Sequence, residues 1–201
     1  PNNRQDRSFD KDKSPYHLVL LAKNETGYKN LIYLDTVAFC EGFYIKPRID
    51  MSILAEHSEG IIALSACLGG YIPRKIMAGE FEAAKEYALK MKAIFGEDFY
   101  LEIQNHNLES EIKVCHGIRI ISEKHNIPMV ATNDVHYLNK EDANTQATLL
   151  CVQTNNVITD GRPIGFETDE FYFKTYDEMK ALFGGFRGAI ENTVKIAEKC
   201  D

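Results

Sequence analysis

The sequence predicts an α/β fold in which a parallel sheet or barrel is covered by helices. Short apolar segments of strand length alternate along the chain with longer segments whose apolar residues recur every three or four positions. This alternation is typical of parallel strands joined by helices. The segments of strand length number four, which is too few to close a barrel. We therefore expect an open sheet, or a barrel whose closing strands precede Pro1.

The expected strands are short and apolar, and they span residues 16–22, 60–66, 98–104 and 127–132. The first two are nearly continuous apolar runs, as buried strands are. In the third, Phe99, Leu101 and Ile103 alternate with other residues, which predicts that one face of that strand is buried.

Helices are expected between and after these strands. The first spans residues 26–40, with Leu31, Leu34 and Ala38 on one face, and the second repeats apolar residues over 81–95 and stops at Gly96. Later helices are marked by Val114, Ile118 and Ile121, by an Asn139 cap before a helix through Leu150, by a capping box of Thr175 and Glu178, and by a stripe of Ile190, Val194 and Ala197. A polar loop over residues 154–167 would separate the α/β body from this helical tail.

Composition bounds the class of protein. The chain has 201 residues, 44% hydrophobic and 26% charged, which suits one globular domain with a large core. The net charge of −7 makes the chain a poor candidate for holding DNA by its overall field, although a local basic patch or a basic partner domain would change this. No apolar run approaches the roughly 20 residues that span a bilayer, and residues 1–14 contain no apolar signal core. We expect a cytoplasmic protein that does not bind membranes.

The five cysteines include no CxxC pair, and their number is odd. Most are expected to be buried apolar residues in a reducing compartment. They are Cys40, Cys67, Cys115, Cys151 and Cys200.

Two strand ends carry side chains that can bind metals. Asp134 and His136 follow the fourth strand two residues apart, so in an extended chain they point the same way and could grip one cation. Cys67 directly follows the second strand, and a thiolate there is a soft ligand for zinc. In parallel α/β folds, reactive residues gather where strands end.

Each candidate also has a simpler interpretation. The Asp134–His136 pair could be a hydrogen-bonded turn, and Cys67 could be ordinary core. His106 is either a pocket residue or a loop histidine. His17 begins its strand, whereas Cys67 and Asp134 follow theirs, so in a strictly parallel sheet His17 would lie at the opposite end. It can join them only if its strand is short, antiparallel or strongly tilted.

Six stretches, in order and with matching spacing, resemble one known family. They are HLVLLAKNETGYKN at 17–30, EGFYIKPR at 41–48, GIIALSAC at 60–67, FYLEIQNH at 99–106, ATNDVHY at 131–137 and LLCVQT at 149–154. Together they resemble the polymerase-and-histidinol-phosphatase (PHP) domain of the alpha subunits of DNA polymerase III, the bacterial replicative polymerases, over about residues 14–201.

This resemblance implies an incomplete, distorted β/α barrel of the PHP type, TIM-like, with a C-terminal helical extension. It divides the chain into a flexible lead-in or linker (1–15), a PHP metal-site domain (16–169) and a helical connection (170–201) toward a palm domain that would follow Asp201. It implies four metal ligands, namely His17, Cys67, Asp134 and His136, as part of a larger set. The remaining ligands, including an HxH motif that this sequence lacks, are expected before Pro1, so metal binding by the chain alone should be partial.

The resemblance also implies the activity of a longer protein. That protein would be a DNA-directed DNA polymerase using magnesium, with DNA, a sliding clamp and a proofreading subunit as partners, and none of its catalytic residues would lie in this chain. The PHP site would hold zinc or manganese and be either a 3′–5′ exonuclease or structural. A free-standing phosphoesterase of the histidinol-phosphatase type is the alternative, and a metal-free structural module is a third possibility. A polymerase-like sequence from Thr175 to Asp201 counts against the phosphoesterase.

Overall fold

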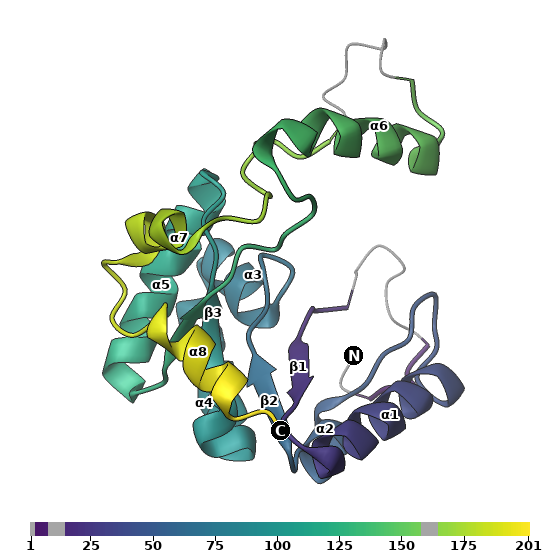
Figure 1. The fold of residues 1–201 in the computed structure, drawn as a ribbon. Coiled ribbons are helices and arrows are strands. Elements are labelled where there is room, and N and C mark those ends of the chain that lie inside the picture. The colour runs from purple at the N-terminus through teal and green to yellow at the C-terminus, as the bar shows by residue number, and fades with distance from the viewer. Residues whose placement is uncertain (1–2, 8–14, 158–164) are drawn as a thin grey trace.

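The computed structural model describes residues 3–7, 15–157 and 165–201 (Figure 1). Within these residues, one four-stranded sheet has the order β1-β2-β3-β4. Its strands are β1 (Val19–Ala22), β2 (Ile61–Leu64), β3 (Phe99–Ile103) and β4 (Met129–Ala131). All four expected strands are therefore present in the described part of the chain, each shorter than its apolar segment. The loop expected over 154–167 lies mostly outside the described residues.

The sheet is mostly parallel. Strands β2, β3 and β4 are parallel neighbours, whereas β1 pairs antiparallel with β2, Val19 lying opposite Leu64. The expectation of a parallel sheet holds for three strands and is wrong for β1. Because β1 is at the end of the strand order, the described residues form an open sheet.

Eight helices accompany the strands in the described residues. They are α1 (Glu25–Cys40), α2 (Met51–Glu56), α3 (Tyr71–Met77), α4 (Phe81–Phe95), α5 (Glu109–His125), α6 (Ala143–Thr154), α7 (Tyr176–Phe183) and α8 (Glu191–Glu198), with short 3₁₀ turns η1 (Gly96–Asp98) and η2 (Lys140–Asp142). The capping box expected at Thr175 is confirmed, and the expected Asn139 cap is present at η2, the turn that leads into α6. Helix α6 projects from the body, and α8 lies across the sheet (Figure 1).

Both faces of the sheet are covered. On one face, Leu101, Ile103 and Met129 pack with side chains of helices α1 to α5 and α7. On the other, Tyr100 and Val130 pack with Ile196 of α8. All five residues of β3 are therefore buried, so the expected burial of Phe99, Leu101 and Ile103 is confirmed and the other face of β3 is buried as well.

The last helix buries only part of the expected stripe. Ile190 packs against the core, but Val194 is 58% exposed, and Asn192 and Ile196 are the buried residues of α8. Asn192 Nδ2 donates a hydrogen bond of 2.7 Å to the Met129 carbonyl at the edge strand β4. The apolar stripe did not predict this face of α8, because the polar side chain of Asn192 faces the edge of β4 that has no neighbouring strand.

Two close contacts join β1 and α1 to neighbouring elements. A Cβ added at Gly27 would lie 1.8 Å from the Gly60 carbonyl oxygen, so only glycine allows α1 to approach this turn before β2. Asp98 is bonded to Lys23 at 2.5 Å and to Lys199 at 2.8 Å, which ties η1 to the end of β1 and to the C-terminus of α8.

Neither a membrane span nor a disulfide is found in the described residues. No helix there combines the length and apolarity needed to cross a bilayer. The cysteine expectation is only partly correct, because Cys115 and Cys151 are buried and Cys67 is half-buried, whereas Cys40 and Cys200 are exposed.

Candidate metal site

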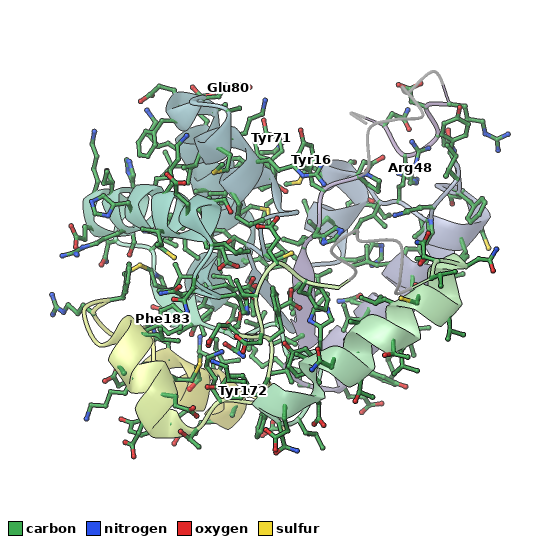
Figure 2. The ribbon with its side chains drawn as sticks, turned by 90° about the horizontal axis from the view of Figure 1, so that it is seen from above. Tyr16, Arg48, Tyr71, Glu80, Tyr172 and Phe183 are labelled. Carbon is green, nitrogen blue, oxygen red and sulfur yellow. The ribbon has the colours of Figure 1, made fainter. Side chains whose placement is uncertain are left out.

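A cavity of about 1210 Å³ lies at the carboxyl ends of the parallel strands. Residues that follow β2 and β4 line it, as do residues at the end of β3: Ala66, Cys67, Glu102, Gln104, Thr132 and Asp134. Glu102 and Thr132 lie two residues after Tyr100 and Val130, so their side chains are on the same face of the sheet. Helix α8 covers this face at Tyr100 and Val130. The opposite wall includes Tyr16 and Tyr71, whose ring centroids are 4.8 Å apart (Figure 2).

His17 lines the same cavity because β1 is antiparallel. The start of an antiparallel strand lies beside the end of its neighbour, and His17 forms a bridge with Gly70 just beyond β2. The antiparallel strand is one of the three conditions under which His17 could join Cys67.

Cys67 and His17 are separated by a distance that suits a shared ion. Cys67 Sγ lies 3.6 Å from His17 Nδ1. Zinc bonds of about 2.3 Å to sulfur and 2.05 Å to nitrogen, at a tetrahedral angle, place these two atoms about 3.6 Å apart. A thiol–imidazole hydrogen bond has a similar length, so the pair is stable without an ion and already positioned for one.

The Cys67 thiol lies in negative surroundings. Burial raises its pKa, and the nearby Asp134 and Glu102 carboxylates raise it further, against a lowering hydrogen bond from the Gly69 amide. Anionic groups that face one another in a partly buried cavity favour a bound cation.

Asp134 is exposed and has a left-handed backbone conformation, with φ of 44°. The preceding residue is held firmly. Asn133 is buried, its Nδ2 donates to the Tyr172 carbonyl at 2.5 Å, and its own carbonyl accepts from His106 Nε2 at 2.6 Å. The position of Asp134 is thus fixed through its neighbour.

His136 departs from the other three candidates. It does not line the cavity; its ring lies 4.4 Å from the Phe166 ring and 5.5 Å from the Phe171 ring, measured between centroids. Its Nδ1 lies 2.6 Å from the Asp134 carbonyl, which makes Nδ1 the protonated nitrogen and leaves the lone pair on Nε2. The tautomer suits metal binding, although the ring is turned away from the cavity.

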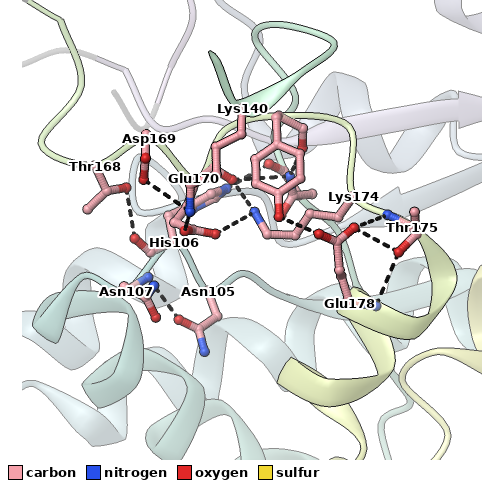
Figure 3. A network of polar contacts seen from close by, with 12 residues as sticks. Asn105, His106, Asn107, Lys140, Thr168, Asp169, Glu170, Lys174, Thr175 and Glu178 are labelled. Carbon is pink, nitrogen blue, oxygen red and sulfur yellow. Dashed lines mark hydrogen bonds and ion pairs between the residues drawn. The ribbon is translucent and has the colours of Figure 1, made fainter. Parts of the chain in front are cut away.

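His106 is a fully buried loop histidine rather than a residue of this cavity. Its Nδ1 lies 2.7 Å from Glu111 Oε1, and its ring stacks on Phe171 at 3.9 Å. Thr168 donates to the His106 carbonyl, and a network of Lys140, Lys174 and Glu170 holds the segment that covers it (Figure 3). This network supports the loop that carries Asp134.

Sequence reasoning missed Glu102. Its side chain is 5% exposed, Oε1 accepts hydrogen bonds from Thr132 at 2.5 Å and Gln104 at 3.1 Å, and Oε2 has no partner among the described residues. Burial raises its pKa, opposed by these hydrogen bonds and by the nearby Ala66 backbone amide, which does not reach hydrogen-bond geometry with Oε2. A carboxylate inside a buried strand was the available signal, but the alternating pattern of 98–104 made the position look exposed.

In the described residues, no group of three or more histidine, cysteine, aspartate or glutamate side chains is arranged to hold a metal ion. His17, Cys67 and Asp134 line one cavity, and their nitrogen, sulfur and oxygen donors are of the kinds that bind divalent metal ions.

Comparison with known proteins gives consistent matches. The PHP domain family matches residues 4–106. The chain is 48% identical over 192 residues to DNA polymerase III subunit alpha of Borreliella burgdorferi, covering 96% of this chain and 17% of that protein. The subunit of the same name from Treponema pallidum is 43% identical, over 100% of this chain and 17% of that protein. The one from Thermus aquaticus is 45% identical, over 94% of this chain and 16% of that protein. The chain thus spans about a sixth of the length of these relatives, and the alignments extend well beyond residue 106.

Proposed function

Because the chain belongs to the PHP domain family, we propose that it is the metal-binding accessory domain of a bacterial replicative DNA polymerase, with His17, Cys67, Asp134 and His136 as metal ligands. The observation that carries this proposal is the identity of 48% over 96% of the chain to a DNA polymerase III subunit alpha. The shared cavity of His17, Cys67 and Asp134 supports the ligand assignment.

The expected ion is zinc or manganese, which a thiolate, an imidazole and a carboxylate can bind together. His136 joins the ion if residues 133–138 turn its Nε2 toward the cavity. When bound, a divalent ion polarises a phosphoryl oxygen and promotes attack by water. The chain's own residues would orient the phosphodiester.

Positive charge in the cavity favours a hydrolytic role over a purely structural one. Lys46 and Lys90 line the same cavity as the candidate ligands, and lysines there can contact a phosphate backbone. Of the acidic residues on that wall, Asp50 is neutralised by Arg4 at 3.2 Å. We therefore propose 3′–5′ exonuclease activity for this site.

The polymerase itself would act outside these residues. The whole protein would copy DNA with magnesium and deoxynucleoside triphosphates, in the cytoplasm, with a sliding clamp and a proofreading subunit as partners. Residues 170–201 would form the connection toward the polymerase palm. A free-standing phosphoesterase is less well supported, because the alignments to polymerase subunits include almost the whole chain.

The test is shortening of a 5′-labelled single-stranded oligonucleotide by the polypeptide that carries this chain, with Mn²⁺ or Zn²⁺ and with a chelator. We expect loss of nucleotides from the 3′ end that requires the metal. Asp134→Ala should reduce the rate by roughly 100-fold or more. Asp35→Ala removes the same charge from an exposed position on α1 and should have no effect.

Three other results would contradict parts of this proposal. Shortening that survives Asp134→Ala would point to another nuclease. Metal binding without shortening would mean that the site is structural. Absence of any bound metal would leave a metal-free structural module.

A further inference from the structure

One oxygen of a buried carboxylate beside the candidate site has no hydrogen-bond partner among the described residues. Glu102 Oε1 is satisfied by Thr132 and Gln104, whereas Oε2 is buried and accepts no hydrogen bond among the described residues. A buried acceptor without a donor costs free energy, so such groups usually have a ligand, a water or an ion as partner.

The position of Glu102 shows what that partner faces. Glu102 lines the same cavity as the thiol of Cys67 and the carboxylate of Asp134, which are both metal-binding groups. A partner of Glu102 Oε2 in this cavity must donate a hydrogen bond or be positive, and water held by a cation does both.

None of the cations in the described residues supplies this partner. Of those that line the cavity, Arg48 donates to the carbonyls of Gly42 and Arg4, Lys75 pairs with Glu80 at 2.6 Å, and neither Lys46 nor Lys90 bonds Glu102. No hydrogen bond within the described part of the chain joins a lysine or an arginine to Glu102.

The side chain of Glu102 is also fixed. Its carboxylate is anchored by two hydrogen bonds and its backbone amide donates to Ser65 Oγ at 2.8 Å. In the described residues, no three metal-binding side chains lie close enough to bind one ion directly. An anchored Glu102 would therefore contact an ion bound at Cys67 and Asp134 through a water molecule.

We propose that Glu102 is a further residue of the cation site, where Oε2 accepts a hydrogen bond from the hydration water of an ion bound by Cys67, His17 and Asp134. This inference rests on the proposed function of the site and adds a residue to it. Glu102 is a positioning residue, which orients water beside the ion. Partners of this kind change metal affinity by about 10- to 100-fold.

The test is Glu102→Gln in the polypeptide that carries the chain, titrated with Mn²⁺ and separately with Zn²⁺ by calorimetry. Glutamine keeps the oxygen that accepts from Thr132 and Gln104, but it turns an NH₂ donor toward the cavity. We expect the dissociation constant for each ion to rise by about 10- to 100-fold. Without metal, the melting temperature should be unchanged or higher, because an unpaired buried charge has been removed.

Glu86→Gln is the matched control. Glu86 lines the same cavity from α4 and is exposed, so this variant makes the same change of charge without the buried, unpaired oxygen. Its affinity for metal should stay within about twofold of the wild type.

The other outcomes each overturn the inference in a recognisable way. Equal losses in Glu102→Gln and Glu86→Gln would mean that only the field of the cavity matters. Loss of both affinity and metal-free stability in Glu102→Gln would mean that Glu102 is purely structural. Normal metal affinity in Glu102→Gln, with affinity lost in Asp134→Ala, would remove Glu102 and leave the proposed site intact. A wild-type protein that binds neither ion would overturn the site and this inference together.

Discussion

The strongest prediction about stability concerns the buried pair of His106 and Glu111. Both ring nitrogens of His106 face oxygen atoms, Glu111 Oε1 at 2.7 Å and the Asn133 carbonyl at 2.6 Å, and we expect the ring to donate to both as the partner of a Glu111 carboxylate. Glu111 Oε2 also accepts from the His106 backbone amide at 2.6 Å. The ring is fully buried and Glu111 is 4% exposed, so solvent does not reach this pair.

Glu111→Gln should destabilise the fold by about 3 kcal/mol, the lower end of the range for removing one partner of a buried ion pair. Glutamine accepts at one oxygen only, so one of the two His106 donors would face an NH₂ group at a distance of less than 3 Å. Glu109→Gln, at an exposed position in the same first turn of α5, should change stability by less than about 0.5 kcal/mol.

The assay is urea unfolding of the chain followed by far-ultraviolet circular dichroism, which suits a protein without tryptophan. A double replacement, His106→Phe with Glu111→Leu, should recover part of the loss because apolar groups leave no charge unpaired. If Glu111→Gln were as stable as the wild type, the carboxyl would be protonated and donating to a neutral ring, since the amide NH₂ could take over that bond. The ion-pair argument would then be wrong.

Three further variants test other contacts by the same unfolding assay. Gly27→Ala should cost more than about 2 kcal/mol, because the new methyl group overlaps the Gly60 carbonyl; a neutral result would mean that α1 does not approach this turn so closely. Thr175→Ala should cost about 1 kcal/mol by removing the cap of α7, and an unchanged midpoint would argue against the cap. Burial raises the pKa of Asp98, but its lysine partners Lys199 and Lys23 lower this pKa by more, to below the usual value of 3.8. The ionised Asp98 therefore stabilises the fold above pH 3.8, and this stabilisation is lost as the pH falls through the lowered pKa of the folded state. Asp98→Asn should cost about 1–2 kcal/mol at pH 7 and progressively less as pH falls below 3.8, and a cost that does not change with pH would refute this linkage.

Local patterns predicted most of the elements. Helix α4 spans the 81–95 repeat and is ended by Gly96 at φ 57°, and the capping box at Thr175 marks the start of α7. Helices α2 and α3 were not predicted, because six and seven residues are too few for a periodic pattern. Burial of the second face of β3 could not be predicted from that strand alone, since it depends on α8, far away in sequence.

The candidate site was predictable only in part for the same reason. Asp134 and Cys67 could be found because they follow apolar strands, which is a local signal. The place of His17 depends on the antiparallel pairing of β1 with β2, which the residues of β1 do not encode by themselves. The burial of His106 depends on Glu111 and on Thr168, and that of Glu102 on Thr132, so neither could be read from its own segment.

The most direct test of the metal site is anomalous diffraction from crystals of the polypeptide grown with Zn²⁺ or Mn²⁺. We expect an anomalous peak in the cavity, about 2.3 Å from Cys67 Sγ and about 2.0–2.2 Å from His17 Nδ1 and an Asp134 oxygen when zinc is bound. The peak should be absent from crystals of Cys67→Ser with Asp134→Ala. A cavity without a peak, or an ion bound only at His136 on the surface, would contradict the assignment of His17, Cys67 and Asp134 to one metal site.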